Sequence, residues 1–242
     1  MIEESPTGRS VLVTGAAGAL GLAVVGSFLD AGWRVAAGVR PGGDGAARLA
    51  SAFPGVGDER LHPTALDVTD AASTTAGAHE AAEALGGLGS AVALAGGYHA
   101  GRRIGEEDPA ALAGLMALNA MSVLLTARAA APHLLARGRG AFVAVSSRTA
   151  VRPWAGSAGY AGSKRAVVGI VEALAAEWQG TGVRASCVLP SMIDTAANRS
   201  AEPTADPSRW VSPTRIASVI RWLCSDEASV VSGASIPVYG DA

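Results

Sequence analysis

The sequence contains few charged residues and few cysteines. Charged residues make up 17% of its 242 residues, and the net charge is −2 with a pI near 6.1. No basic patch is visible, so the composition argues against nucleic acid or an anionic membrane as a partner. Cys187 and Cys224 are the only cysteines. Both lie inside apolar segments, which favours buried thiols over a disulfide or a metal site.

Targeting, membrane-spanning and metal-binding patterns are also missing. The N-terminal stretch 1–6 is acidic and lacks the apolar core of a signal peptide. No apolar run approaches the ~20 residues of a membrane span. The four histidines are scattered without ligand spacing, so no metal site is predicted. We therefore expect a cytoplasmic protein that does not enter a membrane.

The pattern that is present is a regular alternation of short apolar runs with helical segments. Strands are expected at 10–14, 34–40, 61–66, 91–94, 142–145, 183–189 and 234–238. Helices are expected from the glycine-rich turn to residue 29 and at 71–85, 109–136, 161–178 and 213–223, with loops at 41–45 and 190–206. This order predicts an α/β fold: one doubly wound parallel sheet of about seven strands between two helical layers, formed by a single domain over residues 1–242.

A glycine-rich turn joins the first expected strand to the first expected helix. Its glycines let the backbone approach phosphates, and the helix N-terminus offers free N–H groups and a partial positive charge. The turn therefore predicts a dinucleotide pyrophosphate site, although a tight connection alone is the alternative reading. The residues expected to contact the cofactor are Gly15, Ala17, Gly18, Ala19, Leu20 and Gly21.

Two further strand ends carry polar residues that suit a nucleotide. Arg40 ends the second strand where an NAD-binding fold usually has an acid, and an arginine there can pair with the 2′-phosphate of NADP. The alternative is a solvated arginine. Asp67, followed by Val68, ends the third strand and can accept from the adenine amino group, or it can cap the next helix.

Three polar side chains follow the fifth strand. Ser147 ends the strand, and Tyr160 and Lys164 share one face of the next helix because they are four residues apart. A lysine beside a tyrosine lowers the pKa of the phenol and makes it a usable acid or base. The alternative is a solvated pair. Asn119 stands alone in the apolar helix 109–136, where an asparagine usually marks a packing accident or a kink.

At these spacings the chain resembles a classical short-chain dehydrogenase/reductase over essentially its whole length. The family's Tyr-x-x-x-Lys matches Tyr160 and Lys164, its serine matches Ser147, thirteen residues earlier, and its asparagine matches Asn119. In the cofactor motif Thr-Gly-x-x-x-Gly-x-Gly, the middle glycine is replaced by Ala19. The resemblance implies a Rossmann-type fold.

The resemblance also implies a role for each of these residues in hydride transfer between a nicotinamide and a carbonyl or alcohol substrate. Tyr160 is the general acid/base, and Lys164 lowers its pKa while holding the nicotinamide ribose. Ser147 orients the substrate carbonyl, and Asn119 holds a water that links Lys164 to solvent. Arg40 matches family members that use NADP(H), so NAD(H) is the less expected cofactor.

Two departures from the family pattern concern the cofactor loops. The family's Asn-Asn-Ala-Gly is replaced by Ala-Leu-Ala-Gly at 93–96, and its Pro-Gly is replaced by Pro190-Ser191. A threonine that often holds the carboxamide is retained. The expected cofactor contacts in these loops are Ala95, Gly96, Gly97, Pro190, Ser191, Ile193 and Thr195.

The same loops are similar to those of dihydropteridine reductases, which reduce quinonoid dihydropterin. Those enzymes lack the serine and carry an acid after the second strand, so Ser147 and Arg40 favour carbonyl chemistry. A third possibility is a catalytically idle NADP(H)-binding sensor.

Substrate contacts are expected from Trp154 and His99, beside Ser147 and Tyr160. Residues 190–212 are expected to form a substrate lid, in which Trp210 is an anchor. Family resemblance implies a homotetramer or homodimer joined through the long helices at 109–136 and 158–178.

Overall fold

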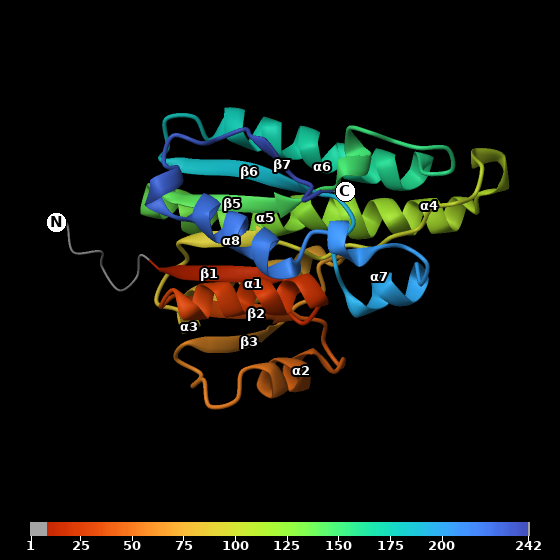
Figure 1. Cartoon of the computed structure of the whole chain (residues 1–242). Coiled ribbons are helices and arrows are strands. Elements are labelled where there is room, and N and C mark those ends of the chain that lie inside the picture. Colours follow the sequence, from red (N-terminus) through yellow and green to blue (C-terminus); the bar gives the residue numbers. More distant parts are fainter. Residues whose placement is uncertain (1–8, 242) are drawn as a thin grey trace.

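A seven-stranded, wholly parallel sheet forms the centre of the molecule (Figure 1). The computed structural model describes residues 9–241. The strands lie in the order β3-β2-β1-β4-β5-β6-β7, which confirms the predicted doubly wound sheet. Their bounds are β1 Ser10–Thr14, β2 Arg34–Val39, β3 Leu61–Ala65, β4 Ser90–Ala93, β5 Gly140–Val145, β6 Val183–Pro190 and β7 Ser235–Val238.

The strand order reverses beside β1, and this reversal places the site. β1 pairs with β2 on one side and with β4 on the other, and Thr14 lies opposite both Gly38 and Ala93. The connections leaving β1 and β4 go to opposite faces, so a crevice opens at the carboxyl ends of these strands. The glycine-rich turn follows β1 at this edge.

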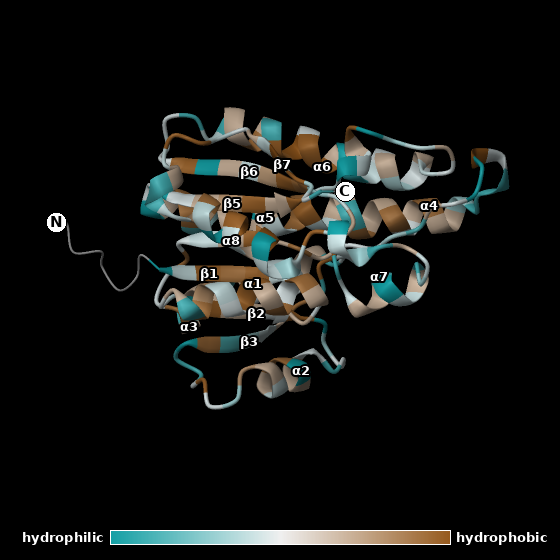
Figure 2. Cartoon of the chain, in the orientation of Figure 1, coloured by the Kyte–Doolittle hydropathy of each residue, from teal (hydrophilic) through white to brown (hydrophobic). Residues whose placement is uncertain are grey.

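Helices cover both faces because the central strands β1, β4 and β5 are buried on both sides. On one face, α1 packs against α8, and their apolar side chains join Val11, Val13 and Val35 in one core. On the other face, α3, α5 and α6 cover a second core that includes Leu12 and Phe142. Figure 2 shows the hydrophobic strands between these layers. The helices are α1 Ala19–Asp30, α2 Gly45–Ala52, α3 Ala71–Ala84, α4 Pro109–Met116, α5 Ser122–Arg137, α6 Ala158–Glu177, α7 Ala196–Ala201 and α8 Pro213–Cys224.

Three local features differ from the sequence expectation. The predicted loop at 41–45 leads into α2, and the predicted loop at 190–206 contains α7. The buried face of α2 consists only of Gly45 and Leu49, and α7 buries no residue. The helix predicted at 109–136 contains a π-helical segment, Ala117–Met121, between α4 and α5. Asn119 lies inside this segment, at the position where a kink was one of the expectations.

The continuous helical stretch Pro109–Arg137 also corrects the expectation about membrane spans. By length and composition it is apolar enough to cross a membrane, with a mean hydropathy of 1.8. A core helix of a globular fold passes the same test, and α5 packs against α3, β4 and β5. Its apolar composition is therefore accounted for in part by its contacts with the sheet.

Candidate active site

The glycine-rich turn brings the chain leaving β1 against the chain leaving β4. Gly15 has a φ of +68°, and a Cβ there would lie 2.8 Å from the backbone nitrogen of Ala95. A Cβ on Gly21 would collide with the carbonyl oxygens of Gly15 and Ala16. Glycine is therefore needed at both positions, for the left-handed turn at Gly15 and for the close approach of α1 to the turn at Gly21.

The first turn of α1 offers unsatisfied donors at this edge. Gly18 is the N-cap without a capping side chain, and the first intrahelical bond runs from Leu22 N to Gly18 O at 2.8 Å. The N–H groups before Leu22 therefore have no partner within the helix, and the first turn contains no acidic residue. Ala17, Ala19 and Leu20 lie around this terminus, where a pyrophosphate would be favoured.

Arg40 and Asp67 lie at the same edge, after β2 and β3. Arg40 is exposed, and its charge is among the influences that lower the pKa of Asp67. The largest influence on this pKa is the hydroxyl of Thr69, which donates to Asp67 Oδ1 at 2.6 Å. The helix cap is Asp70, whose carboxylate accepts from Ser73 N, so the alternative that Asp67 caps α3 is wrong. Val68 is buried beneath this turn.

Ser147, rather than its neighbour Ser146, lies beside Tyr160. A hydrogen bond between Ser147 and Tyr160 opposes the main effect on Tyr160, which is a pKa raised by burial. Ser146 Oγ instead donates to the carbonyl oxygen of Lys164 at 2.7 Å. Ser146 therefore fastens α6 to the end of β5, and Ser147 is left facing the phenol.

The structure reverses the predicted electrostatic effect on Tyr160. Burial raises the pKa of the phenol, Tyr98 raises it further, and Lys164 is not among the influences on it. Lys164 is buried, and burial lowers the pKa of its amine to about 8. Its Nζ donates to Val145 O at 3.1 Å, so the amine is held at the end of β5. Lys164 is the only lysine in the chain, which has eighteen arginines.

Asn119 connects the loop after β4 to α6. Its Oδ1 accepts from Gly97 N at 2.7 Å, and its Nδ2 donates to Gly97 O at 3.0 Å and to Ser163 Oγ at 2.9 Å. Ser163 Oγ in turn donates to Tyr160 O at 2.9 Å. A Cβ on Gly96 would lie 2.9 Å from Asn119 Oδ1 and 3.1 Å from Lys164 Nζ, so only glycine fits between them. The predicted water relay through Asn119 stays a prediction.

Sequence reasoning missed Tyr98 as a site residue. Its ring lies edge-on to that of Tyr160, with the centroids 5.0 Å apart and the planes at 72°. His99 pairs through Nε2 with Glu107 Oε2 at 2.9 Å, and its predicted contact with the substrate stays a prediction. Trp154 is exposed, and its backbone bonds to Ser157, so its predicted role at the substrate also stays a prediction.

The predicted lid, residues 190–212, is a loop whose two ends are held together. Ile193 and Val211 form a parallel bridge at its base. Within it, the hydroxyl of Thr195 caps α7, and Asn198 Nδ2 donates to Ile193 O at 2.8 Å. Pro190 ends β6, and Ser191 Oγ donates to the carbonyl oxygen of Tyr239, so both ends of the lid are fastened.

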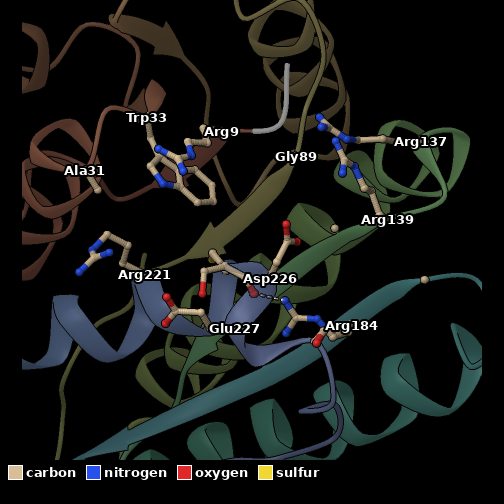
Figure 3. A pocket seen from close by; sticks show the side chains of 15 residues that line it. Arg9, Ala31, Trp33, Gly89, Arg137, Arg139, Arg184, Arg221, Asp226 and Glu227 are labelled. Carbon is tan, nitrogen blue, oxygen red and sulfur yellow. Dashed lines mark hydrogen bonds between the residues drawn. The ribbon is translucent and has the colours of Figure 1, made fainter. Parts of the chain in front are cut away.

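One cavity, of about 460 Å³, lies at the opposite, amino edge of the sheet (Figure 3). It is lined by Arg9, Arg137, Arg139, Arg184 and Arg221 together with Asp226 and Glu227. Its arginines suit the carboxyl ends of α5 and α8, where carbonyl groups carry partial negative charge. Arg184, for example, donates to Leu223 O at 2.9 Å and to Ser225 O at 3.0 Å. None of the predicted catalytic residues lines this cavity.

Comparison with known proteins agrees with this geometry. The family model for short-chain dehydrogenases matches residues 9–206. The D-threitol dehydrogenase of Mycolicibacterium smegmatis is 32% identical, over 96% of this chain and 92% of that protein. The 2,5-dichloro-2,5-cyclohexadiene-1,4-diol dehydrogenase LinX of Sphingobium indicum is 31% identical, over 96% of this chain and 95% of that protein.

Solved structures show the same fold. A mutant short-chain dehydrogenase/reductase of Serratia marcescens is 27% identical, with a TM-score of 0.86 over 98% of this chain and 99% of that one. ElxO with NADP bound has a TM-score of 0.90 at 21% identity, over 96% of this chain and 97% of that one.

The chain therefore belongs to the short-chain dehydrogenase/reductase family. It is an NAD(P)-dependent oxidoreductase that acts on alcohol or carbonyl substrates.

Proposed function

We propose that this protein is an NADPH-dependent reductase of ketones or aldehydes. The observation that carries the proposal is the arrangement of Ser147, Tyr160 and Lys164 at the carboxyl edge of the sheet, beyond the glycine-rich turn. A nicotinamide cofactor bound along this edge would supply the hydride. The protein residues then hold the substrate and move the proton.

Ser147 and Tyr160 act on the substrate oxygen. The Ser147 hydroxyl donates a hydrogen bond to the carbonyl, and Tyr160 delivers the proton as the oxygen becomes an alkoxide. Burial raises the pKa of Tyr160, which keeps the phenol protonated at neutral pH. A protonated phenol is the form that can deliver a proton to the oxygen of a carbonyl substrate.

Lys164 belongs to α6, and its amine reaches the end of β5. There the amine can bind the ribose hydroxyls of the cofactor. One of its protons is donated to Val145 O, which leaves donors for a ligand. Gly96 separates this amine from Asn119 without a side chain. The absence of a side chain at Gly96 therefore leaves space beside the Lys164 amine.

The preference for NADPH rests on Arg40. It is exposed just after β2 and contributes to the lowered pKa of Asp67, so its positive charge acts at this edge. Titration of the protein with NADPH and NADH should show tighter binding of NADPH, and Arg40→Ala should remove most of that difference. An unchanged ratio of NADPH to NADH affinity in Arg40→Ala would show that other residues set the preference. Tighter binding of NADH than of NADPH by the wild type would favour the pterin alternative.

Tyr160→Phe tests the chemistry. The variant should bind NADPH as the wild type does, because it loses only a hydroxyl, while carbonyl reduction should fall by about 10²-fold or more. A panel of ketones, aldehydes and a quinonoid dihydropterin would locate the substrate class. Wild-type protein that binds NADPH but turns over none of these would instead act as a cofactor-binding sensor.

We also propose a homo-oligomer joined through α4 and α5. Met116, Met121 and Leu124 are exposed along this helical stretch, although each is hydrophobic. A second copy of the chain would cover them. Leu124→Glu should convert the oligomer to a monomer in light-scattering chromatography, and a wild-type monomer would contradict the proposal.

A further inference from the structure

Tyr98 presents a large aromatic surface beside the catalytic tyrosine. Its side chain is 68% exposed, yet its ring lies 5.0 Å from the ring of Tyr160, edge to face. An aromatic pair of this geometry is attractive, which holds the two rings together. Much of the Tyr98 ring is left uncovered by the rest of residues 9–241.

The loop that carries Tyr98 is fastened on both sides of this residue. Before it, both backbone polar groups of Gly97 bond to the side chain of Asn119. After it, His99 pairs with Glu107, whose side chain is only 5% exposed, and Gly101 N donates to Gly156 O at 2.9 Å. An exposed tyrosine between such anchors is held in position rather than free to move with a loose loop.

The position of the reacting carbonyl follows from the proposed function, on which this inference rests. The carbonyl oxygen must lie within hydrogen-bonding distance of the Tyr160 hydroxyl and of Ser147. The Tyr98 and Tyr160 rings are in contact, so a substituent on the carbonyl carbon lies within reach of the Tyr98 ring. A flat or cyclic substituent covers such a ring better than a flexible chain and loses less conformational entropy on binding.

We propose that Tyr98 is a specificity-determining residue that selects substrates in which the carbonyl belongs to, or is attached to, a six-membered ring. The Tyr98 ring forms one wall of the substrate site, and Tyr160 lies at its edge. The aromatic ring, not the Tyr98 hydroxyl, makes the selection.

The test compares matched pairs of substrates in wild type, Tyr98→Ala and Tyr98→Phe. Cyclohexanone is paired with 3-hexanone, and benzaldehyde with heptanal, each with NADPH. Wild type should prefer the ring compound in kcat/KM. Tyr98→Ala should reduce this preference by about ten-fold, mainly through KM for the ring compound, whereas Tyr98→Phe should retain it.

Two controls keep the test specific to Tyr98. Trp222→Ala removes another partly exposed aromatic ring, on α8, and should leave the preference unchanged. NADPH affinity should be equal in all four proteins, which shows that each variant is folded and its cofactor site intact.

The outcomes separate this inference from the proposed function. Wild-type turnover without a preference for rings, or a preference that survives in Tyr98→Ala, overturns the inference and leaves the proposed function standing. A preference lost in Tyr98→Phe as well overturns the role of the ring. Absence of Tyr160-dependent turnover with every carbonyl compound overturns both.

Discussion

The side-chain amide of Asn119 pairs with the peptide groups of Gly97 in both directions. Oδ1 accepts from Gly97 N at 2.7 Å while Nδ2 donates to Gly97 O at 3.0 Å, as a neighbouring β-strand would. The second proton of Nδ2 goes to Ser163 Oγ. One buried asparagine thus joins the loop after β4 to α6, the helix that carries Tyr160 and Lys164.

Asn119→Ala should therefore loosen the active site as well as the fold. The substitution removes partners from Gly97 and Ser163, and each buried polar group without a partner costs about 1–3 kcal/mol. We expect a lower free energy of unfolding in urea and a decrease in kcat. Asn198→Ala is the matched control, because the side chain of the chain's other asparagine bonds, among residues 9–241, to Ile193 O alone. Equal effects of the two variants would contradict the linking role of Asn119.

Ser147→Ala and Ser146→Ala should differ in their effect on kcat. Removing the Ser147 hydroxyl should lower kcat by about 10²-fold, and it also removes the hydrogen bond that Thr149 N donates to it at 3.2 Å. Removing the Ser146 hydroxyl should cost about 0.5–1.5 kcal/mol of stability, because its bond to Lys164 O is lost, and leave kcat within a few-fold of wild type. Steady-state kinetics and thermal unfolding of both variants check this. The reverse pattern would transfer the catalytic role to Ser146.

The pKa of Lys164 is directly measurable, because the chain contains one lysine. Protein labelled with ¹³C-lysine should show a single lysine Cε signal by NMR that titrates near pH 8, against about 10.5 in the urea-unfolded chain. Between these values the unfolded chain binds more protons. This group therefore increases stability as the pH rises from about 8 to 10.5 and opposes folding below that window. A folded-state midpoint above 10 would refute the effect of burial.

Two glycines on α1 should respond differently to alanine. In Gly21→Ala the added Cβ meets the carbonyl oxygens of Gly15 and Ala16, so we expect a lower melting temperature and at least ten-fold weaker NADPH binding. In Gly26→Ala the nearest atom lies 3.4 Å away, on the Phe53 ring. That variant should be neutral or up to about 1 kcal/mol more stable, because alanine favours the helix. NADPH titration and calorimetry distinguish the two.

The sheet was predictable because its central strands are apolar on both faces and its strands alternate with helices. The positions of Ser147, Tyr160 and Lys164 followed from strand ends and helical spacing, and the structure places them at one edge. The short helices α2 and α7 offered too few buried positions to be predicted, since α2 buries two residues and α7 none. The π-helical segment around Asn119 is defined by its backbone hydrogen bonds. Its residue types do not distinguish it from an ordinary α-helix.

Other features of the site depend on contacts between distant segments. Tyr98 is one exposed aromatic in a glycine-rich loop, and only the folded chain shows that it touches Tyr160. The pKa of Tyr160 depends on burial, which the spacing of a tyrosine and a lysine does not report. The sequence does not show that His99 pairs with Glu107, which lies eight residues later, in the segment before α4.

The single lysine also determines how this protein reacts with amine-directed reagents. Apart from the chain terminus, succinimidyl esters, aldehyde fixatives and coupling resins can find only the Lys164 amine, which is buried beside the cofactor edge. A bound nucleotide would shield that amine, so acylation of Lys164 should report occupancy of the site. Surface attachment that spares the enzyme must therefore use the terminal amine, its arginines, its acids or an introduced cysteine.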